Sequence, residues 1–412
     1  MNLKKVIKSN LLLFIVIAVS FSVIFYRFIL IPKQLAFDEV EFAKLALSLK
    51  SSPYSVYSTL ATGHSTLYFY TLLLSFNFFG ISNFALRLPA AIYGVLGAGL
   101  SYLILKKSFA TSEKNIGNLL AAGGAIAMVT SHWYLNFARF SFEATFLIFL
   151  ELVSIYFLFR FRESKSRTTI LLSAVFAGLA FNSYYPGRLF FLIPLVSFIY
   201  LKAKPKLILL FLTGFLVVSS PLIVYLSSHP DIRISEQLYL TNPHLSPSEK
   251  MSMFTENTIK TALMFNIKGD ANGRHNYPEK PALNPILGLF FIAGLILSFR
   301  RLRHYQDFAF ISFCLISLIP SLLTYPQENP HMLRTVTAIL PVIYFAVLAA
   351  NWIIHKAQSQ SKNIVRFILL ILFLSSTVYE LRTYFYYQTK VFNKAFEIKN
   401  PLPKALTQPY DK

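Results

Sequence analysis

The chain has 412 residues, of which 55% are hydrophobic and only 14% are charged. Soluble domains carry about 25% charged residues, so this composition excludes an ordinary soluble protein. A net charge of +21 would suggest nucleic-acid binding in a soluble chain. Here Lys and Arg cluster at the ends of apolar segments instead, which is typical of cytoplasmic loops. We therefore predict an all-α polytopic membrane protein that binds the lipid bilayer and no nucleic acid.

The first apolar segment, residues 11–31, predicts a retained transmembrane helix. It is longer than the roughly 7–15 apolar residues of a signal peptide, and no small-x-small cleavage site follows it. The segment 33–83 is predicted to form the first outer loop. It contains an amphipathic helix near 38–50 and a short apolar helix at 65–79. We place this short helix beside the membrane, because counting it as a span would put every later basic cluster on the wrong side.

The later spans alternate between the two sides, and each basic cluster marks a cytoplasmic end. Five of them are predicted at 86–105, 116–136, 143–159, 207–226 and 364–379. Two more flank the outer sequence NSYYPGR (182–188). The other three end at 300–304, at 325–334 and at 355–356. The result is one domain, 1–412, with a bundle of about eleven spans and a long outer loop at 227–282.

Unusual polar residues gather on the predicted outer face of this bundle. They are Asp38, Glu39, His64, Arg87, Arg139, Glu143, Arg188, Asp270, Arg274, His275, Glu328, His331 and Arg334. A chance scatter would divide between the two faces, so the clustering indicates a functional site on one of them.

The stretch FDEVEF (37–42) opens the first outer loop with three acids. One interpretation is structural: Asp38 followed by Glu41 fits a helix N-cap and its third residue, and Phe37 with Phe42 fits a hydrophobic staple. The other interpretation is catalytic. Both stay open from this stretch alone.

A second acid strengthens the catalytic interpretation. Arg139 and Glu143 are four residues apart, as on one helix face, and Glu143 lies at the membrane edge, where an ionisable group is a functional candidate. A surface ion pair between the two is the alternative. Acids from separate spans suit a site in which one carboxylate deprotonates a hydroxyl or amine while another orients it or holds a divalent cation such as Mg²⁺ or Mn²⁺. No residue is assigned as a metal ligand, and no other cofactor is predicted.

Cationic side chains on the same face could bind a leaving phosphate, because Arg and His suit phosphate oxygens. The candidates are Arg188, Arg274, His275, His331 and Arg334. Each one also fits a loop salt bridge or a lipid-headgroup contact.

At these residues the chain resembles the membrane-embedded, polyprenyl-phosphate-sugar-dependent glycosyltransferases of the GT-C fold. Within that fold it is similar to the protein mannosyltransferase and aminoarabinose-transferase branch, families 39 and 83. The resemblance covers nearly the whole chain. It rests on FDEVEFAKLAL (37–47), GHSTLYFYTLLLSFNFFGISNFALRLPAAIYGVL (63–96), NFARFSFEATF (136–146), the RHN loop (274–276) and ENPHMLR (328–334).

The resemblance implies inverting transfer of a sugar from a lipid phosphate, such as undecaprenyl or dolichyl phosphate, to a protein, lipid or glycan acceptor. Asp38 matches the family's catalytic acid, with Glu39 beside it, and Glu143 matches a second acidic position that is Asp in many relatives. His331 and Arg334 fall where relatives contact the donor phosphate. The predicted substrate-binding residues are His64, Tyr68, Arg139, Tyr184 and Tyr185.

The predicted location is the plasma membrane, with the site facing the non-cytoplasmic side. A transporter or flippase for lipid-linked oligosaccharides is the alternative from another class. Such proteins usually contain repeated halves and mid-bilayer ionisable residues, and the sequence shows no internal repeat. An O-antigen ligase or polymerase is the nearer alternative, since it also handles lipid-linked sugars, but it would not need paired acids in the first outer loop.

Overall fold

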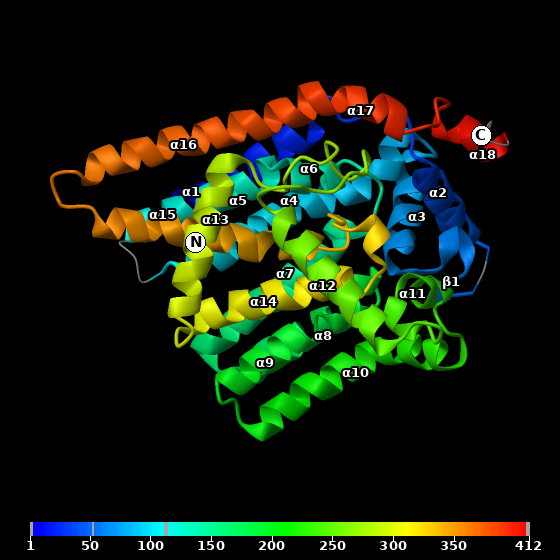
Figure 1. The fold of residues 1–412 in the computed structure, drawn as a ribbon, viewed down its shortest axis with the longest axis horizontal. Helices are drawn as coiled ribbons and strands as arrows, with labels where there is room; N and C mark the ends of the chain where they lie inside the picture. The colour runs from blue at the N-terminus through cyan, green and yellow to red at the C-terminus, as the bar shows by residue number, and fades with distance from the viewer. Residues whose placement is uncertain (1–2, 52, 111–113, 409–412) are drawn as a thin grey trace.

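The computed structural model describes residues 3–51, 53–110 and 114–408, and nearly all of its regular structure is helical. Long helices run side by side in a bundle, with short helices and loops collected at one end (Figure 1). Among the described residues, the only sheet is a hairpin of β1 (Tyr57–Ser58) and β2 (His64–Ser65). The all-α prediction is confirmed.

A helix occupies each predicted span. The helices are α1 (Leu3–Phe25), α4 (Asn83–Ser108), α5 (Lys114–Thr130), α7 (Ala144–Ser164), α8 (Arg167–Phe181), α9 (Leu192–Tyr200), α10 (Pro205–Ser228), α13 (Pro285–Arg300), α14 (Tyr305–Leu322), α15 (Ile339–Lys356) and α16 (Lys362–Arg382). Within the described parts of the chain, six helices are long and apolar enough to cross a membrane: α4, α7, α10, α14, α15 with the turn before it, and α16 with its extension. The others are shorter apolar helices, so the number of spans stays a prediction.

Polar residues at the helix starts explain where several of these helices begin. Ser82 and Asn284 accept hydrogen bonds from the backbone N–H groups three residues later, at 3.2 Å and 3.0 Å. Such N-caps satisfy amide donors that the first helical turn leaves without a partner. Pro205 and Pro285 stand at first helical positions, where the missing N–H of proline has no consequence.

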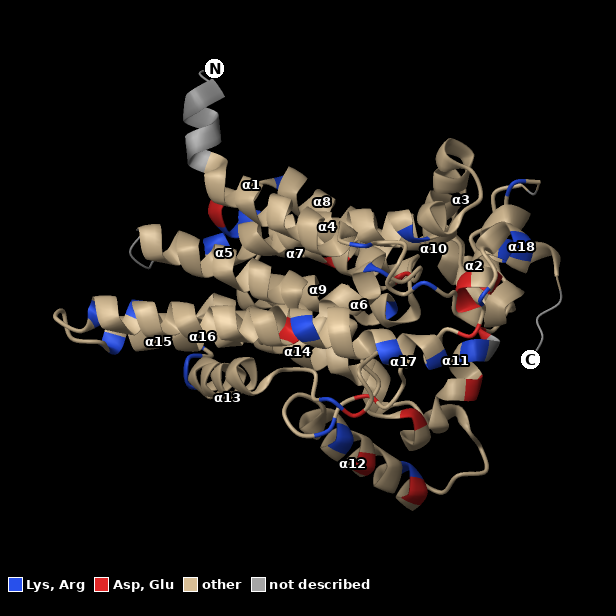
Figure 2. Cartoon of the chain, turned by 90° about the horizontal axis from the view of Figure 1, so that it is seen from above, with Lys and Arg blue, Asp and Glu red and all other residues tan. Residues whose placement is uncertain are grey.

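The two ends of the bundle differ in structure and charge. One end, which we call the site end, carries α2 (Phe37–Ser48), α3 (Leu67–Phe79), the hairpin, α11 (Ile232–Gln237) and the C-terminal α17 (Gln388–Ala395) and α18 (Leu402–Thr407), as Figure 1 shows. The α9–α10, α13–α14 and α15–α16 connections lie at the opposite end. Lys and Arg mark the α15–α16 connection, whereas acids lie together with further Lys and Arg around α2, α11 and α18 (Figure 2). The helices predicted for the first outer loop are therefore confirmed as α2 and α3.

The predicted cap of α2 was wrong. The N-cap is Ala36, and its N–H donates to Glu39 Oε2 at 3.1 Å, so Glu39 takes the place predicted for Glu41. The predicted staple does not form either: Phe37 is 46% exposed, whereas Phe42 is buried against aromatic rings. Asp38 consequently has no role in capping its helix.

The predicted span 116–136 is broken six residues before its C-terminal end. Helix α5 stops at Thr130, and Ser131 caps a separate short helix, α6 (His132–Ala138), by accepting from the N–H of Tyr134 at 3.2 Å. Arg139 ends α6 and Glu143 precedes α7. The two residues therefore lie in a break between helices, and the predicted shared helix face is wrong.

Candidate active site

A cavity of about 640 Å³ opens at the site end. Its lining includes residues of α2, α11, α12 (Pro247–Met264), the loop before α13 and the loop between α14 and α15. The lining residues that carry charge or a titratable group are Asp38, Tyr184, Arg233, Lys260, Lys268, Asp270, Arg274, His275, Glu279, Glu328, His331 and Arg334. Six residues predicted for the site from sequence thus line one cavity from segments far apart in the chain: Asp38, four of the phosphate-binding candidates, and Tyr184.

Asp38 faces this cavity from the first turn of α2. Its carboxylate accepts a hydrogen bond from Arg274 at 2.7 Å, and the Asp38 side chain remains 38% exposed. The loop that carries Arg274 is fixed from behind, because Gln388 of α17 donates to the carbonyls of Gly273 and Asn276 at 2.8 Å and 3.0 Å. The acid and the guanidinium are therefore held opposite each other while both can still meet a ligand.

The segment that presents Asp38 is anchored by the C-terminal part of the chain. Leu35 and Ile398 exchange two backbone hydrogen bonds of 2.9 Å, and the N–H of Phe37 donates to Glu397 at 3.2 Å. This tether fixes the chain immediately before α2. The position of Asp38 thus depends on contacts that join opposite ends of the sequence.

Arg334 and His331 form another wall of the cavity. Arg334 is 3% exposed, and it donates to Glu328 and, at 3.2 Å, to the Thr324 hydroxyl. Burial lowers the pKa of His331 well below its usual range, and the positive charge of Arg334 lowers it further. His331 is consequently a neutral imidazole at neutral pH, and Arg334 carries the charge of this wall.

A smaller cavity adjoins the first and shares Tyr184 and Arg233 with it. Here Glu143 Oε2 lies 3.1 Å from His64 Nδ1, while Oε1 of Glu143 has no hydrogen-bond partner among the described residues. Arg233 Nη1 lies 3.0 Å from the other ring nitrogen of His64. Burial raises the pKa of the Tyr184 phenol well above its usual range, and the neighbouring Tyr185 raises it further. Arg233 stands at one end of the row Glu143–His64–Arg233 and lines both cavities.

The hairpin presents His64 to Glu143. Gly63, at its turn, has φ +94°, and a Cβ there would lie 2.2 Å from the hydroxyl oxygen of Tyr57. Only glycine fits such a left-handed position under a neighbouring side chain without strain. The glycine of the GHS sequence is therefore required by the shape of this turn.

Glu39 lies behind the cavity and is not part of its lining. Arg87 donates to both of its carboxylate oxygens at 2.7 Å, and both side chains are fully buried. Arg87 also donates to the carbonyls of Pro32 and Gln34, and the N–H of Ser141 donates to Glu39 at 3.0 Å. All of these groups are satisfied inside the protein, a geometry that favours a structural role over the predicted catalytic one.

Six other predicted residues lie outside the large cavity, and four of them line the smaller one: His64, Glu143, Tyr185 and Arg188. Arg139 is buried and donates to backbone carbonyls at the end of α1 and just after it, including that of Ile31 at 2.9 Å. It does not pair with Glu143, so the predicted surface ion pair is wrong. Tyr68 is fully buried against Phe69 and Phe146. Arg188 lines the smaller cavity, where it donates to Asp231 at 2.8 Å.

Arg233 was missed from the sequence although it lines both cavities. Its guanidinium lies over the rings of Tyr184 and Tyr185, 5.7 Å and 5.5 Å from their centroids. It stands near the start of α11, whose N-cap Asp231 accepts from the N–H of Ile234. The only signal in the sequence was this acid followed by an arginine two residues later, which is too common to single out a site.

Comparison with known families and structures gives an independent view of the fold. The family model of dolichyl-phosphate-mannose-protein mannosyltransferase matches residues 63–225. The crystal structure of ArnT from Cupriavidus metallidurans bound to undecaprenyl phosphate is similar, with a TM-score of 0.56 and 13% identity over 93% of this chain and 76% of ArnT. A comparison with curated protein sequences found no match.

Two structures of an oligosaccharyltransferase from Archaeoglobus fulgidus are also similar. The apo form has a TM-score of 0.55 and 13% identity over 100% of this chain and 62% of the archaeal one. The form tethered to an acceptor peptide containing the NVT sequon has a TM-score of 0.52 and 12% identity over 97% of this chain and 60% of the archaeal one. The chain is therefore an integral membrane protein with the GT-C fold, which confirms the resemblance predicted from the sequence, and its residues 63–225 match the dolichyl-phosphate-mannose-protein mannosyltransferase family.

Proposed function

We propose that this protein transfers a sugar from a polyprenyl-phosphate donor to a hydroxyl or amine of an acceptor, with inversion at the sugar carbon. The observation that carries the proposal is the position of Asp38. It is a partly exposed carboxylate in a cavity of about 640 Å³ whose other walls supply Arg233, Arg274 and Arg334. A base facing a set of cations suits a reaction that releases a proton on one side and an anion on the other.

In the proposed step, Asp38 accepts the proton of the acceptor hydroxyl or amine. The acceptor atom bonds to the anomeric carbon from the face opposite the phosphate, and the bond between that carbon and the phosphate oxygen breaks. The donor phosphodiester carries one negative charge, and the released polyprenyl phosphate carries more. Arg274 and Arg334 stabilise this added charge, because guanidinium groups donate paired hydrogen bonds to phosphate oxygens.

The row Glu143–His64–Arg233 serves as a positioning element in this proposal. His64 lies 3.1 Å from Glu143 and 3.0 Å from Arg233, so it connects a fully buried carboxylate with a guanidinium that lines both cavities. Tyr184 and Tyr185 hold the same guanidinium from the side. These contacts hold the charge of Arg233 in the wall that the two cavities share, where it can bind a donor phosphate.

The similar structures support the donor class. The positions of the basic connections support the membrane side on which the cavity is proposed to open. ArnT was crystallised with undecaprenyl phosphate, and the archaeal enzyme with an acceptor peptide. A protein, lipid or glycan acceptor is compatible with a cavity of this size. The basic connections predicted to be cytoplasmic lie opposite the site end (Figure 2), so the cavity would face the non-cytoplasmic side of the plasma membrane.

Flipping of a lipid-linked oligosaccharide is less well supported. Carriers bind their substrates near the middle of the membrane, whereas both cavities described above are at one end of the bundle. One buried acid, Glu151 of α7, lies away from that end and has a carboxylate oxygen without a hydrogen-bond partner in the described structure. A lone carboxyl does not make a transport pathway, and an O-antigen ligase or polymerase remains the nearer alternative.

The decisive experiment incubates membranes containing the protein with a panel of radiolabelled polyprenyl-phosphate sugars and identifies any labelled product. Asp38→Asn should lower transfer by about 10²- to 10⁴-fold, the usual contribution of a general base, without changing the thermal unfolding midpoint in detergent. Glu41→Gln, on the same helix but outside the cavity, is the matched control. Full activity of a folded Asp38→Asn protein would refute the proposal.

A further inference from the structure

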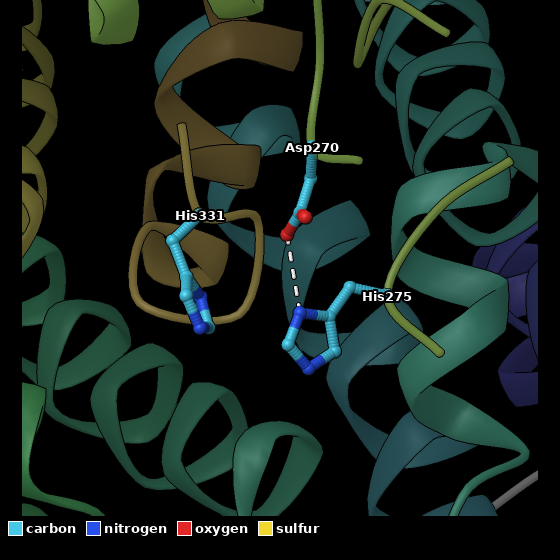
Figure 3. A group of neighbouring side chains, drawn as sticks. All are labelled: Asp270, His275 and His331. Carbon is cyan, nitrogen blue, oxygen red and sulfur yellow. Dashed lines mark hydrogen bonds and ion pairs between the residues drawn. The ribbon is translucent and has the colours of Figure 1, made fainter. Parts of the chain in front are cut away.

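Three potential metal ligands converge at the edge of the large cavity. Asp270 and His275 belong to the loop between α12 (Pro247–Met264) and α13, and His331 belongs to the loop between α14 and α15. One ligand atom from each residue lies within 4.8 Å of the others. Figure 3 shows the carboxylate and the two imidazoles entering the same space from separate backbone segments. We propose that Asp270, His275 and His331 bind a divalent transition-metal ion of the zinc class.

The types of ligand decide the class of ion. Two imidazoles with one carboxylate are a common protein ligand set for zinc, in which a fourth position stays open. Mg²⁺ and Ca²⁺ prefer sites built from oxygen atoms alone. The Mg²⁺ or Mn²⁺ considered from the sequence is therefore a poorer match for this cluster than Zn²⁺.

The distances are close to those that the ion would need. Zinc binds nitrogen and oxygen ligands at about 2.0–2.2 Å, so tetrahedral ligand atoms are roughly 3.3 Å apart. His275 Nδ1 already lies 3.1 Å from Asp270 Oδ2. His331 is the more distant member of the set, and its ring centroid lies 4.7 Å from that of His275. Its ligand atom lies within 4.8 Å of the other two, so His331 would have to move closer to complete the site.

The surrounding hydrogen bonds hold the carboxylate of Asp270 in place. Its Oδ2 accepts from the N–H of Met332 at 2.9 Å, and its Oδ1 accepts from the N–H of Asn272 at 2.8 Å. Trp133 in turn donates to the carbonyl of Met332 at 2.9 Å. Such outer contacts orient metal ligands and strengthen binding. The hydrogen bond between Met332 and Asp270 also joins the two loops. A bound ion would cross-link the loop before α13 to the loop before α15.

All three residues line the same cavity as Asp38 and Arg334. The open fourth position of the ion therefore faces that cavity and would accept an anionic oxygen. The assignment of this anionic oxygen to the donor phosphate rests on the proposed function. Binding of the ion itself does not.

The test measures zinc on the full-length protein, purified in detergent with an affinity tag that contains no histidine. After chelation, re-equilibration with Zn²⁺ and desalting, mass spectrometry should find about one zinc per chain, and Mg²⁺ at the same concentration should not compete. His275→Gln and His331→Gln should each lower the zinc association constant at least tenfold. His244→Gln, an exposed histidine just before α12, should leave it unchanged.

Two further readouts separate loss of the site from misfolding. Co²⁺ bound to the wild-type protein should give the visible absorption of a tetrahedral complex, and both histidine variants should lose it. Zn²⁺ should raise the unfolding midpoint of the wild type but not of the variants. Stoichiometric zinc that survives in both variants, or a wild type that binds no zinc, would overturn the site. A donor panel without any product would remove the proposed function and leave a measured zinc site standing.

Discussion

Several charges that line the large cavity are more exposed than the charges packed behind it. In the lining, the side chains of Asp38, Arg274 and Glu328 are 38%, 26% and 64% exposed. Behind it, Glu39 and Arg87 are fully buried with every group satisfied by protein. Buried charges that are fully paired maintain a fold, whereas partly exposed charges can exchange their partner for a ligand.

The difference is sharpest between neighbours in the sequence. Asp38 and Glu39 lie in the same helical turn, and successive residues of an α-helix point about 100° apart. That rotation directs Asp38 into the cavity and Glu39 towards Arg87 of α4. Neutralising Asp38 should therefore impair sugar transfer, whereas neutralising Glu39 should destabilise the fold.

The largest effect on stability is expected for Glu39→Gln. The substitution leaves the guanidinium of Arg87 buried beside a neutral amide, and breaking a buried ion pair typically destabilises a protein by about 3–5 kcal/mol. The measurement is the thermal unfolding midpoint in detergent, together with the yield of folded protein.

The double variant Glu39→Gln/Arg87→Met is the matched comparison for that experiment. It removes both charges, so it should recover part of the lost stability, since the penalty comes from the unpaired charge. If Glu39→Gln instead kept its stability and lost only sugar transfer, Glu39 would act with Asp38 on the reaction. The distinction between charges that line the cavity and buried charges that stabilise the fold would then be wrong.

The parts of the fold that could be predicted follow from local composition. Apolar length and basic flanks placed a helix at each expected span, because the energetics of a span depend on the span itself and on the membrane. The same loop charges identified 65–79 as a short helix, now α3. Asp38 was also predicted from its neighbourhood, as an acid at the start of the predicted first outer loop, and it lines the large cavity.

The contacts inside the site could not be predicted in this way. Arg87 is 48 residues from Glu39, and Arg233 is 169 residues from His64. A sequence shows which residues carry charge but not which charges meet once the helices pack. Asp270 and His331, which lie 61 positions apart in the sequence, are an example: no spacing motif connects them, and only the folding of two loops brings them together.

A smaller effect, on activity alone, is expected for Glu143→Gln. The amide keeps the shape of the side chain but removes the charge that faces His64. A hydrogen bond to a charged group contributes about 1.5–3 kcal/mol, so kcat/KM for sugar transfer should fall roughly 10- to 100-fold. Glu143→Asp should retain more activity, because it keeps the charge.

The depth of the loss in kcat/KM defines the role of Glu143. A positioning role predicts that Glu143→Gln folds normally and still transfers sugar slowly. A loss as deep as that of Asp38→Asn would show that Glu143 itself touches the reacting atoms. Unchanged kinetics would show that the row Glu143–His64–Arg233 has no part in the reaction.

The smallest effect is expected for Glu41→Gln, the third acid of α2. Glu41 pairs with Lys44 at 2.8 Å, one turn along the same helix, and the two side chains are 24% and 41% exposed. A pair of this kind contributes about 0.2–0.5 kcal/mol, so the unfolding midpoint and sugar transfer should both stay close to wild type. Loss of transfer in this variant would mean that the acids of α2 act as a group through their summed charge. In that case the rotation of Asp38 into the cavity would no longer explain why it, and not its neighbours, is the proposed base.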